Sequence, residues 1–338
     1  MGEFLSEPNK EKHSEDKENE FVRYGSCGMQ GWRKRMEDAH ITDISLADKR
    51  FEIFGVFDGH GGKEVSQFVK EIFTKTFLTS EKLKVNDVKG AIEETFLKMD
   101  ILMEEPEGKS RLAELAKISK AEDEAQDKKL GTNNLLSNMI INKSETDVAL
   151  MTGCTACVCV IDETEKKIYF ANSGDSRVVL CKNGTAYRMS LDHKPDLEIE
   201  KNRITKAEGW ISDGRVKGNL NLSRGFGDLE YKGNKNLSQE EQMITAFPDI
   251  VTEELTEDDQ FIIIGCDGIW DCLQDQQACD FVKKRLFASS EKSEQLKVKI
   301  SGILEKMLDE ICAKDVLSES GVGCDNMTCL VIQFKHNK

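Results

Sequence analysis

The chain has no apolar run long enough to cross a membrane, because no segment approaches the roughly 18 to 20 consecutive apolar residues of a membrane helix. Residues 1–20 also lack the apolar core of a signal peptide. Basic residues are outnumbered, since 47 Lys and Arg stand against 62 Asp and Glu and give a net charge of -15. Nucleic acid and anionic lipid both require basic surface to displace counterions, so we expect neither as the main partner.

The cysteine spacing of a secreted disulfide framework is absent as well. The chain has 11 cysteines, an odd number, and most lie inside apolar segments. This usage favours a reducing, intracellular compartment, and we expect a cytoplasmic or nuclear protein. Neither an EF-hand loop nor a Walker P-loop is present. The hydrophobic content of 38% over 338 residues is enough for a real core, in one large domain or two ordinary ones.

Composition changes along the chain indicate one folded domain with polar additions. Residues 1–20 are highly charged and aperiodic, which predicts a flexible N-terminal tail. We expect a single domain over residues 21–335. Within it, residues 104–147 are polar and acidic, which favours an insertion or loop with room for one helix. Residues 209–236 are rich in glycine and predict a surface flap near a site.

Hydrophobic periodicity predicts both strands and helices. The expected strands cover residues 51–57, 261–266 and 327–334, with a hairpin inside 151–180 around a polar turn. The expected helices begin near Val65, Val88 and Ile300, where apolar residues recur at helical spacing. Strands and helices therefore come in blocks rather than in strict alternation. This order favours an α+β fold with largely antiparallel sheets.

Four apolar stretches each run into an aspartate beside glycine or asparagine. These aspartates are Asp58, Asp175, Asp267 and Asp325. An isolated ionised carboxylate at the edge of a β core is costly to desolvate, so several together require cations, hydrogen bonds or water. Oxygen ligands suit the hard ions Mg²⁺ and Mn²⁺. Any one Asp-Gly pair alone is more often a turn, but the set of four predicts a metal site.

Longer motifs make the chemistry specific. They are Arg33-Lys-Arg-Met-Glu37-Asp38, Gly55-Val-Phe-Asp58-Gly59-His60-Gly61-Gly62, Gly153-Cys-Thr-Ala, Asn172-Ser-Gly-Asp175-Ser-Arg177, Asp192-His-Lys-Pro195, Asn221-Leu-Ser-Arg224-Gly-Phe-Gly-Asp228, Cys266-Asp267-Gly-Ile-Trp-Asp271 and Cys324-Asp325-Asn326. In this order, over about residues 22–335, the chain resembles the metal-dependent protein phosphatases of type 2C. The resemblance implies a central sandwich of two mainly antiparallel β-sheets flanked by helices, in four layers α-β-β-α.

The resemblance also implies a centre of two Mg²⁺ or Mn²⁺ ions. Asp58 would bridge them, Glu37 and the Gly59 carbonyl would serve one ion, and Asp267 and Asp325 would serve the other. Asp175 and Asp271 match a weaker third-ion position in the family, which shares Asp267.

Three further residues receive catalytic roles from the resemblance. Arg33 would bind the substrate phosphate, because a guanidinium can donate two parallel hydrogen bonds to phosphate oxygens. His60 would be the general acid for the leaving oxygen, because imidazole titrates near neutral pH. Asp38 would orient the attacking water. We therefore expect a serine/threonine phosphatase acting on phosphorylated proteins by direct attack of metal-activated water.

Two alternatives from other classes remain open at this point. A catalytically silent phosphoprotein-binding module on the same fold and a structural cation-binding protein would both be favoured by missing ligands, and none is missing. A cysteine phosphatase is not favoured, although Cys27 and Arg33 have the Cys-x5-Arg spacing of that class, and we interpret the match as accidental. Its usual flanking residues are absent, since Ser26 and Lys34 stand in their place.

The N-terminus fits the skeleton of a myristoylation signal, with Gly2 after the initiator and Ser6 four residues on. Glu3 is a poor neighbour for the acceptor glycine, and the acidic segment that follows lacks a basic patch to reinforce one acyl chain. If Gly2 is acylated, we expect only weak and reversible membrane association.

Overall fold

The computed structural model describes residues 4–130, 148–287, 298–316 and 321–335. The chain forms two compact units. Unit 1 is made of Met1–Asp58, Ala156–Asp192 and Asp249–Lys338, and unit 2 of Gly59–Thr155 and His193–Pro248. The chain therefore leaves one unit and enters the other after Asp58, Thr155, Asp192 and Pro248.

Unit 1 contains a six-stranded sheet in the order β1-β2-β16-β15-β9-β10, and every neighbouring pair is antiparallel. Its strands are β1 (Phe4–Glu18), β2 (Val22–Arg33), β9 (Arg177–Lys182), β10 (Thr185–Arg188), β15 (Asp259–Gly265) and β16 (Met327–Phe334). The central strands β15 and β16 are mostly apolar and are buried along most of their length. A sheet that is covered on both faces requires such continuous apolar strands.

Unit 1 also contains a five-stranded antiparallel sheet in the order β14-β8-β7-β4-β3. Its strands are β3 (Ala39–Ser45), β4 (Phe51–Phe57), β7 (Ala156–Asp162), β8 (Lys167–Ser173) and β14 (Asp249–Glu254). β7 and β8 form the predicted hairpin around its polar turn. All seven residues of β4 are buried, so the strand that leads to Asp58 is a rigid central strand.

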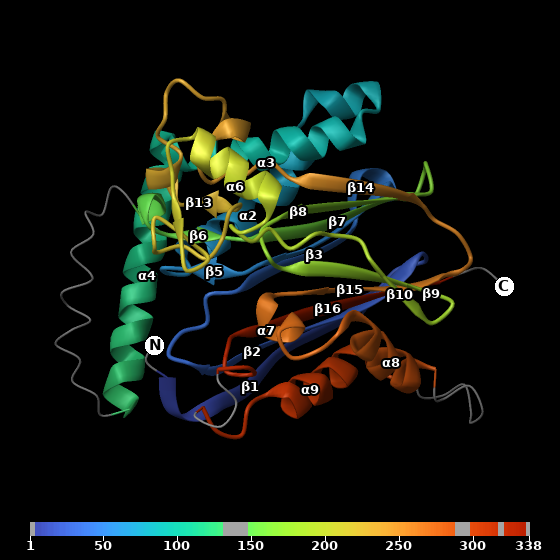
Figure 1. Cartoon of the computed structure of the whole chain (residues 1–338). Coiled ribbons are helices and arrows are strands. Elements are labelled where there is room, and N and C mark those ends of the chain that lie inside the picture. Colours follow the sequence, from blue (N-terminus) through green and yellow to red (C-terminus); the bar gives the residue numbers. More distant parts are fainter. Residues whose placement is uncertain (1–3, 131–147, 288–297, 317–320, 336–338) are drawn as a thin grey trace. The chain divides into compact units, whose positions relative to one another are not determined.

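The two sheets of unit 1 share one core. The rings of Tyr24 on β2 and Phe54 on β4 meet edge to face with centroids 5.3 Å apart. The outer face of the six-stranded sheet is covered by helices α8 (Asp275–Leu286) and α9 (Ile300–Ile311), which lie along it in Figure 1. Short helices α1 (Leu46–Lys49) and α7 (Asp267–Trp270) follow β3 and β15. The predicted α+β class with antiparallel sheets in a sandwich is confirmed.

Unit 2 is mainly helical. Its helices are α2 (Glu64–Leu78), α3 (Val88–Glu104), α4 (Pro106–Leu130) and α6 (Glu198–Lys206), with short 3-10 helices η1 (Glu81–Val85), η2 (Val148–Leu150), η3 (Leu229–Tyr231) and η4 (Gln239–Glu241). Three short strands, β5 (Gly59–His60), β6 (Gly153–Cys154) and β13 (Phe226–Gly227), form a small sheet in the order β13-β6-β5. The Phe96 ring packs against both Phe73 and Phe226, and this contact fixes α3 against α2 and β13.

The prediction of a flexible tail over residues 1–20 is wrong for residues 4–18. Residues Phe4–Glu18 form strand β1, which pairs antiparallel with β2 at the edge of the six-stranded sheet. Edge strands are commonly charged, because charge discourages pairing with other chains. Register shifts between Phe4 and Asn9 and between Asn9 and Lys12 also interrupt the alternation of side chains that would have marked a strand.

The expected insertion at 104–147 is largely one helix as far as the structure describes it. α4 spans Pro106–Leu130, with Leu112 and Leu115 buried and Ile118 exposed. Residues 131–147 of the insertion lie outside the described residues. The expected flap at 209–236 contains the two-stranded hairpin of β11 (Ile211–Ser212) and β12 (Arg215–Val216). Among the described residues, no helix is both long and apolar enough to span a membrane.

Candidate active site

Carboxylates converge in unit 1 where the central strands end. Asp58 directly follows β4, and Asp38 directly precedes β3, its antiparallel neighbour. Asp267 is the first residue of α7, one residue after Cys266 at the end of β15. Asp38, Asp58 and Cys266 each offer a ligand atom, and these atoms lie within 4.8 Å of one another.

The charges that act on Asp58 indicate that five of the predicted carboxylates lie close together. Burial, followed by the negative charges of Asp267, Asp38, Asp175 and Asp325, raises the pKa of Asp58 well above its usual value. The ionised form of Asp58 is therefore unfavourable unless a cation is nearby. The charges of Asp175, Asp267 and Asp325 thus all act on Asp58, the fourth aspartate of the set.

Asp38 gives the same indication independently. Its side chain is buried, and neither carboxylate oxygen has a hydrogen-bond partner in the described part of the chain. Burial, together with the charge of Asp325, raises the pKa of Asp38 to about 6. A buried carboxylate without partners is costly, and a divalent cation with its water would compensate it. The residues present therefore fit a site for hard cations.

Cys266 belongs to this cluster but is a poor ligand for such ions. Burial, followed by the charges of Asp38 and Asp58, raises the pKa of its thiol well above the usual value. Its sulfur accepts a hydrogen bond from the Thr328 backbone N–H at 3.2 Å. A neutral, soft thiol does not compete with carboxylates for Mg²⁺ or Mn²⁺. Sequence reasoning did not place Cys266 here.

Arg33 lies at the end of β2, beside the carboxylate cluster. Its Nη2 donates to Asp325 Oδ2 at 2.5 Å, and about half of its side chain is exposed. Burial alone would lower the pKa of the guanidinium. The charges of Asp325, Asp267 and Asp58 outweigh burial and raise this pKa. A partly exposed guanidinium beside acidic groups is placed to bind an anion from solvent.

Asn326 fixes the segment between Arg33 and Glu37. Its Oδ1 accepts from the Glu37 backbone N–H at 2.9 Å, and its Nδ2 donates to the carbonyls of Gln30 and Arg35. Gly31 makes this approach possible, because a Cβ there would lie 2.5 Å from the Asp325 carbonyl oxygen. Glu37 is half-buried at the clamped segment. Asn326 belongs to a motif of the sequence, but only the structure shows that its side chain binds the backbone between Gln30 and Glu37.

The two weaker candidates differ in their surroundings. Asp175 is buried and its charge reaches Asp58. Asp271 is exposed at the end of α7, and its backbone N–H donates to the Asp267 carbonyl at 2.8 Å. Asp271 therefore lies one helical turn after Asp267.

Gly59 and His60 follow Asp58 in the chain and form β5 of unit 2. His60 Nε2 lies 2.6 Å from Asp228 Oδ2. The Asp228 side chain is only 5% exposed, whereas the His60 side chain is 26% exposed. The imidazole thus has a buried carboxylate on one side and access to solvent on the other.

Comparison with known proteins gives this arrangement a family. A model of the family Protein phosphatase 2C matches residues 22–115 and 108–317. A relative from Arabidopsis thaliana, named probable protein phosphatase 2C 21, is 43% identical over 343 residues, which cover 99% of this chain and 93% of the relative. The chain belongs to the protein phosphatase 2C family.

Other comparisons agree with this membership. A relative from Paramecium tetraurelia, named probable protein phosphatase 2C 4, is 42% identical over 99% of both chains. Among solved structures, a phosphatase from Toxoplasma gondii aligns with a TM-score of 0.67 at 21% identity, over 97% of this chain and 96% of that chain. A serine-threonine phosphatase 2C from the same organism aligns with a TM-score of 0.62 at 17% identity, over 98% of both chains. These structural similarities show the fold.

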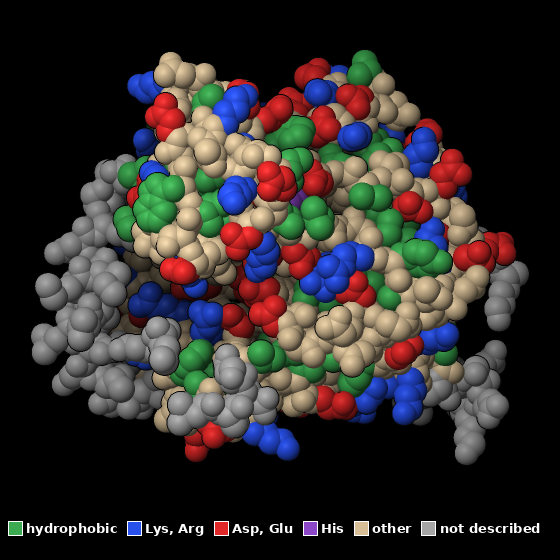
Figure 2. Space-filling view, viewed as in Figure 1, with side chains coloured by type: hydrophobic (Ala, Val, Ile, Leu, Met, Phe, Trp, Pro, Cys, Tyr) green, Lys and Arg blue, Asp and Glu red, His purple; other side chains and the backbone are tan. Residues whose placement is uncertain are grey.

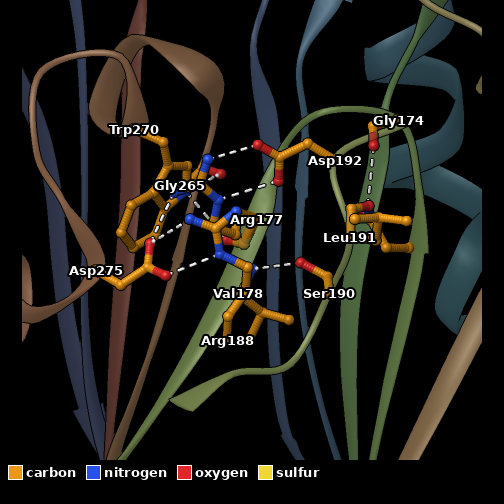
Figure 3. A network of polar contacts seen from close by, with 11 residues as sticks. Gly174, Arg177, Val178, Arg188, Ser190, Leu191, Asp192, Gly265, Trp270 and Asp275 are labelled. Atoms are coloured by element: carbon orange, nitrogen blue, oxygen red, sulfur yellow. Dashed lines mark hydrogen bonds and ion pairs between the residues drawn. The ribbon is translucent and has the colours of Figure 1, made fainter. Parts of the chain in front are cut away.

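Arg177 of the Gly-Asp-Ser-Arg motif pairs with two aspartates of unit 1. Figure 3 shows its guanidinium between Asp192 and Asp275, at 2.5 and 2.7 Å, and 5.1 Å from the Trp270 ring centre. Among the described residues, these are the acids that Arg177 pairs with, rather than Asp175 two residues before it. Through Asp275, Arg177 connects the start of α8 to β9. Asp175 does not pair with Arg177, and its charge acts on Asp58.

The Cys-x5-Arg spacing has a structural explanation instead of a catalytic one. Cys27 is fully buried in the middle of β2, between β1 and β16. Burial raises the pKa of the Cys27 thiol to about 11, so it is not the thiolate that a cysteine phosphatase requires. Such a nucleophile also needs a phosphate loop at a helix N-terminus, and Cys27 and Arg33 lie on one strand.

Proposed function

We propose that this chain is a metal-dependent protein serine/threonine phosphatase that removes phosphate from phosphoserine and phosphothreonine by direct attack of water. The buried carboxylate cluster around Asp58 carries the proposal. Two Mg²⁺ or Mn²⁺ ions would be held by Glu37, Asp58, the Gly59 carbonyl, Asp267 and Asp325, with Asp175 and Asp271 as a weaker third position. Bound there, the ions would supply Lewis-acid activation of water and neutralise phosphate charge.

The chain's own residues supply the remaining steps. Arg33 binds the phosphate oxygens through its guanidinium, and its contact with Asp325 holds that guanidinium in place before substrate arrives. Asp38 accepts a hydrogen bond from the attacking water through one of its buried oxygens. His60 donates a proton to the seryl or threonyl oxygen as it leaves.

Phosphorylated proteins are the substrate class that this arrangement favours. The family resemblance and the half-exposed Arg33 support it. On the face shown in Figure 2, Lys and Arg side chains are interspersed with Asp and Glu. Together with the net charge of -15, this distribution argues against nucleic acid as a partner.

The test is release of phosphate from a phosphoserine peptide by the purified chain. We expect turnover with Mn²⁺ that a chelator abolishes, that Asp58→Asn reduces by at least about a hundredfold, and that Cys27→Ser leaves unchanged. Activity that survives both the chelator and Asp58→Asn, or that disappears with Cys27→Ser in a folded protein, overturns the metal mechanism. Phosphopeptide binding without turnover in the wild type would favour the silent binding module.

We infer an intracellular location, in the cytoplasm, the nucleus or both. All eleven cysteines are free thiols, and ten of them are buried, which suits a reducing compartment. Gly2 lies outside the described residues, and its acylation remains part of the proposal. Imaging of a C-terminally tagged chain beside Gly2→Ala tests both points: we expect a diffuse intracellular signal, and export from the cell would contradict it.

A further inference from the structure

The side chain of His60 contacts a carboxylate, Asp228, to which the proposed function assigns no role. Its Nε2 lies 2.6 Å from Asp228 Oδ2, and the Asp228 side chain is almost completely buried. An ionised carboxylate only accepts hydrogen bonds, so Nε2 is the nitrogen that carries the proton in this contact. Nδ1 is then the ring nitrogen directed away from Asp228. A hydrogen bond to a charged group of this length fixes both the tautomer and the orientation of the ring.

The small sheet of unit 2 is built around this contact. Both His60 and Gly227 are paired with Gly153, one on each side of it. A Cβ at Gly153 would lie 2.3 Å from Asp228 Oδ2 and 2.7 Å from His60 Nε2. Only glycine therefore leaves room for the carboxylate and the imidazole to meet across β6.

The backbone of Asp228 has an uncommon conformation at the residue that contacts His60. Its φ of +51° lies in the left-handed region, which residues with a side chain adopt far less often than glycine does. Its backbone N–H donates to the Thr152 carbonyl at 3.0 Å. Strain of this kind persists only where the surroundings hold it, and it is common at functional sites.

A buried ion pair holds the strained turn. Asp100 on α3 accepts from the Gly227 backbone N–H at 2.9 Å and from Lys232 Nζ at 2.6 Å. Lys232 also donates to the Gly225 carbonyl at 2.7 Å, and both ionic side chains are 8% exposed. The pair thus joins the residues before and after Asp228 to a helix of unit 2. Such a buried pair contributes little net stability but a specific local geometry.

From these contacts we propose that Asp228 is a positioning residue for His60, and that the Asp100–Lys232 pair holds Asp228 in place. The proposal rests on the proposed function, because it assigns His60 a leaving oxygen to protonate. It adds that the doubly protonated ring donates its Nδ1 proton to the leaving oxygen and keeps the Nε2 proton against Asp228, which leaves a neutral imidazole. Asp228 itself touches neither the substrate nor the reacting atoms in this account.

A double-mutant cycle on the full chain with Mn²⁺ tests the proposal. The substrates are a phosphoserine peptide, whose alkoxide leaving group needs a proton, and p-nitrophenyl phosphate, whose leaving group needs little protonation. We expect Asp228→Asn to lower kcat on the peptide by about tenfold with little change in KM, and to affect p-nitrophenyl phosphate much less. In a His60→Ala background, Asp228→Asn should cause no further loss.

Asp162→Asn is the matched control, because Asp162 is a fully buried carboxylate 2.6 Å from Arg50 and has no part in the site. It should lower stability without changing the ratio of the two activities. Equal losses on both substrates with Asp228→Asn, or losses that multiply with those of His60→Ala, overturn the positioning role. A wild type without metal-dependent turnover overturns the proposed function and this inference together.

A measurement on the wild-type chain covers the case in which Asp228→Asn fails to fold. Nitrogen NMR of ¹⁵N-histidine, with the His60 signals assigned by His60→Gln, reports which ring nitrogen carries the proton. We expect a proton on Nε2 with the shift of a strong hydrogen bond. A neutral ring protonated only at Nδ1 contradicts the proposal.

Discussion

Arg33 is the residue through which substrate phosphate should be bound, and it allows a direct prediction. Lysine keeps the charge but loses the planar fork that contacts Asp325 and phosphate together. We expect Arg33→Lys to raise KM for a phosphopeptide and to lower kcat/KM by about 10- to 100-fold. Arg188→Lys is a matched control, since Arg188 is an equally exposed arginine paired with Asp275. Unchanged KM in Arg33→Lys would contradict the assignment.

Glu52 predicts a pH dependence of stability away from the site. It is fully buried on β4, and burial, followed by a hydrogen bond with Glu163, raises its pKa from 4.5 to about 8. Because the folded-state pKa is the higher one, the protonated carboxyl stabilises the fold at low pH, and this stabilisation is lost as the pH rises toward 8.

Replacement of Glu52 by glutamine should remove this dependence. We expect urea unfolding of the wild type to show a free energy of unfolding that falls between pH 5 and pH 8 by at least about 1 kcal/mol more than in Glu52→Gln. Glu254→Gln, at an exposed position of β14, should behave as the wild type. Parallel pH profiles of the wild type and Glu52→Gln would show that Glu52 is ionised throughout.

At the residue scale, the clustering of the acids was predictable because they lie next to the ends of apolar strands. Asp58 and Asp267 follow the apolar strands β4 and β15, Asp325 precedes the apolar strand β16, and the charges of Asp267 and Asp325 act on Asp58. Asp228 had no such signal for its role. It lies 168 residues from His60 in the chain, and a hydrogen bond across that separation leaves no periodicity in the sequence.

At the scale of elements, β1 shows where hydrophobic periodicity fails. Central strands such as β4 reveal themselves because both faces are buried, whereas β1 has one free edge and alternates between half-buried and exposed residues. Its charged residues make long-range contacts that composition does not reveal. Lys12 pairs with Asp309, and Asp16 accepts from the Ser301 backbone N–H at the start of α9.

Asp16 should therefore act as a cap for α9 from another element. Its Oδ1 accepts from the Ser301 N–H at 2.9 Å, and its Oδ2 accepts from the Ser301 hydroxyl. We expect Asp16→Ala to lower the free energy of unfolding by about 1 kcal/mol, as loss of a helix cap does. Glu11→Ala on the same strand is the control, and denaturant unfolding is the measurement. Equal stability of the two variants would mean that residues 4–18 are not held against α9.

At the scale of the whole molecule, the fold class was predictable and the division into units was not. Blocks of strands and helices correctly indicated an α+β fold with antiparallel sheets. The sequence predicts one domain over residues 21–335 and gives no sign that the chain passes between two compact units after Asp58, Thr155, Asp192 and Pro248. Units assembled from separate segments carry no linker of distinctive composition, so the boundaries lie at ordinary strand ends and loops.

The proposed mechanism requires that the carboxylate cluster around Asp58 holds the catalytic ions. Calorimetric titration of Mn²⁺ into the chelator-treated, dialysed chain tests it most directly, with Asp58→Asn beside it and Asp162→Asn as the control carboxylate of the same unit. We predict two strong sites in the wild type and in Asp162→Asn, and loss of both in Asp58→Asn, because Asp58 would contribute to each. Two ions bound by Asp58→Asn with wild-type affinity would contradict the account.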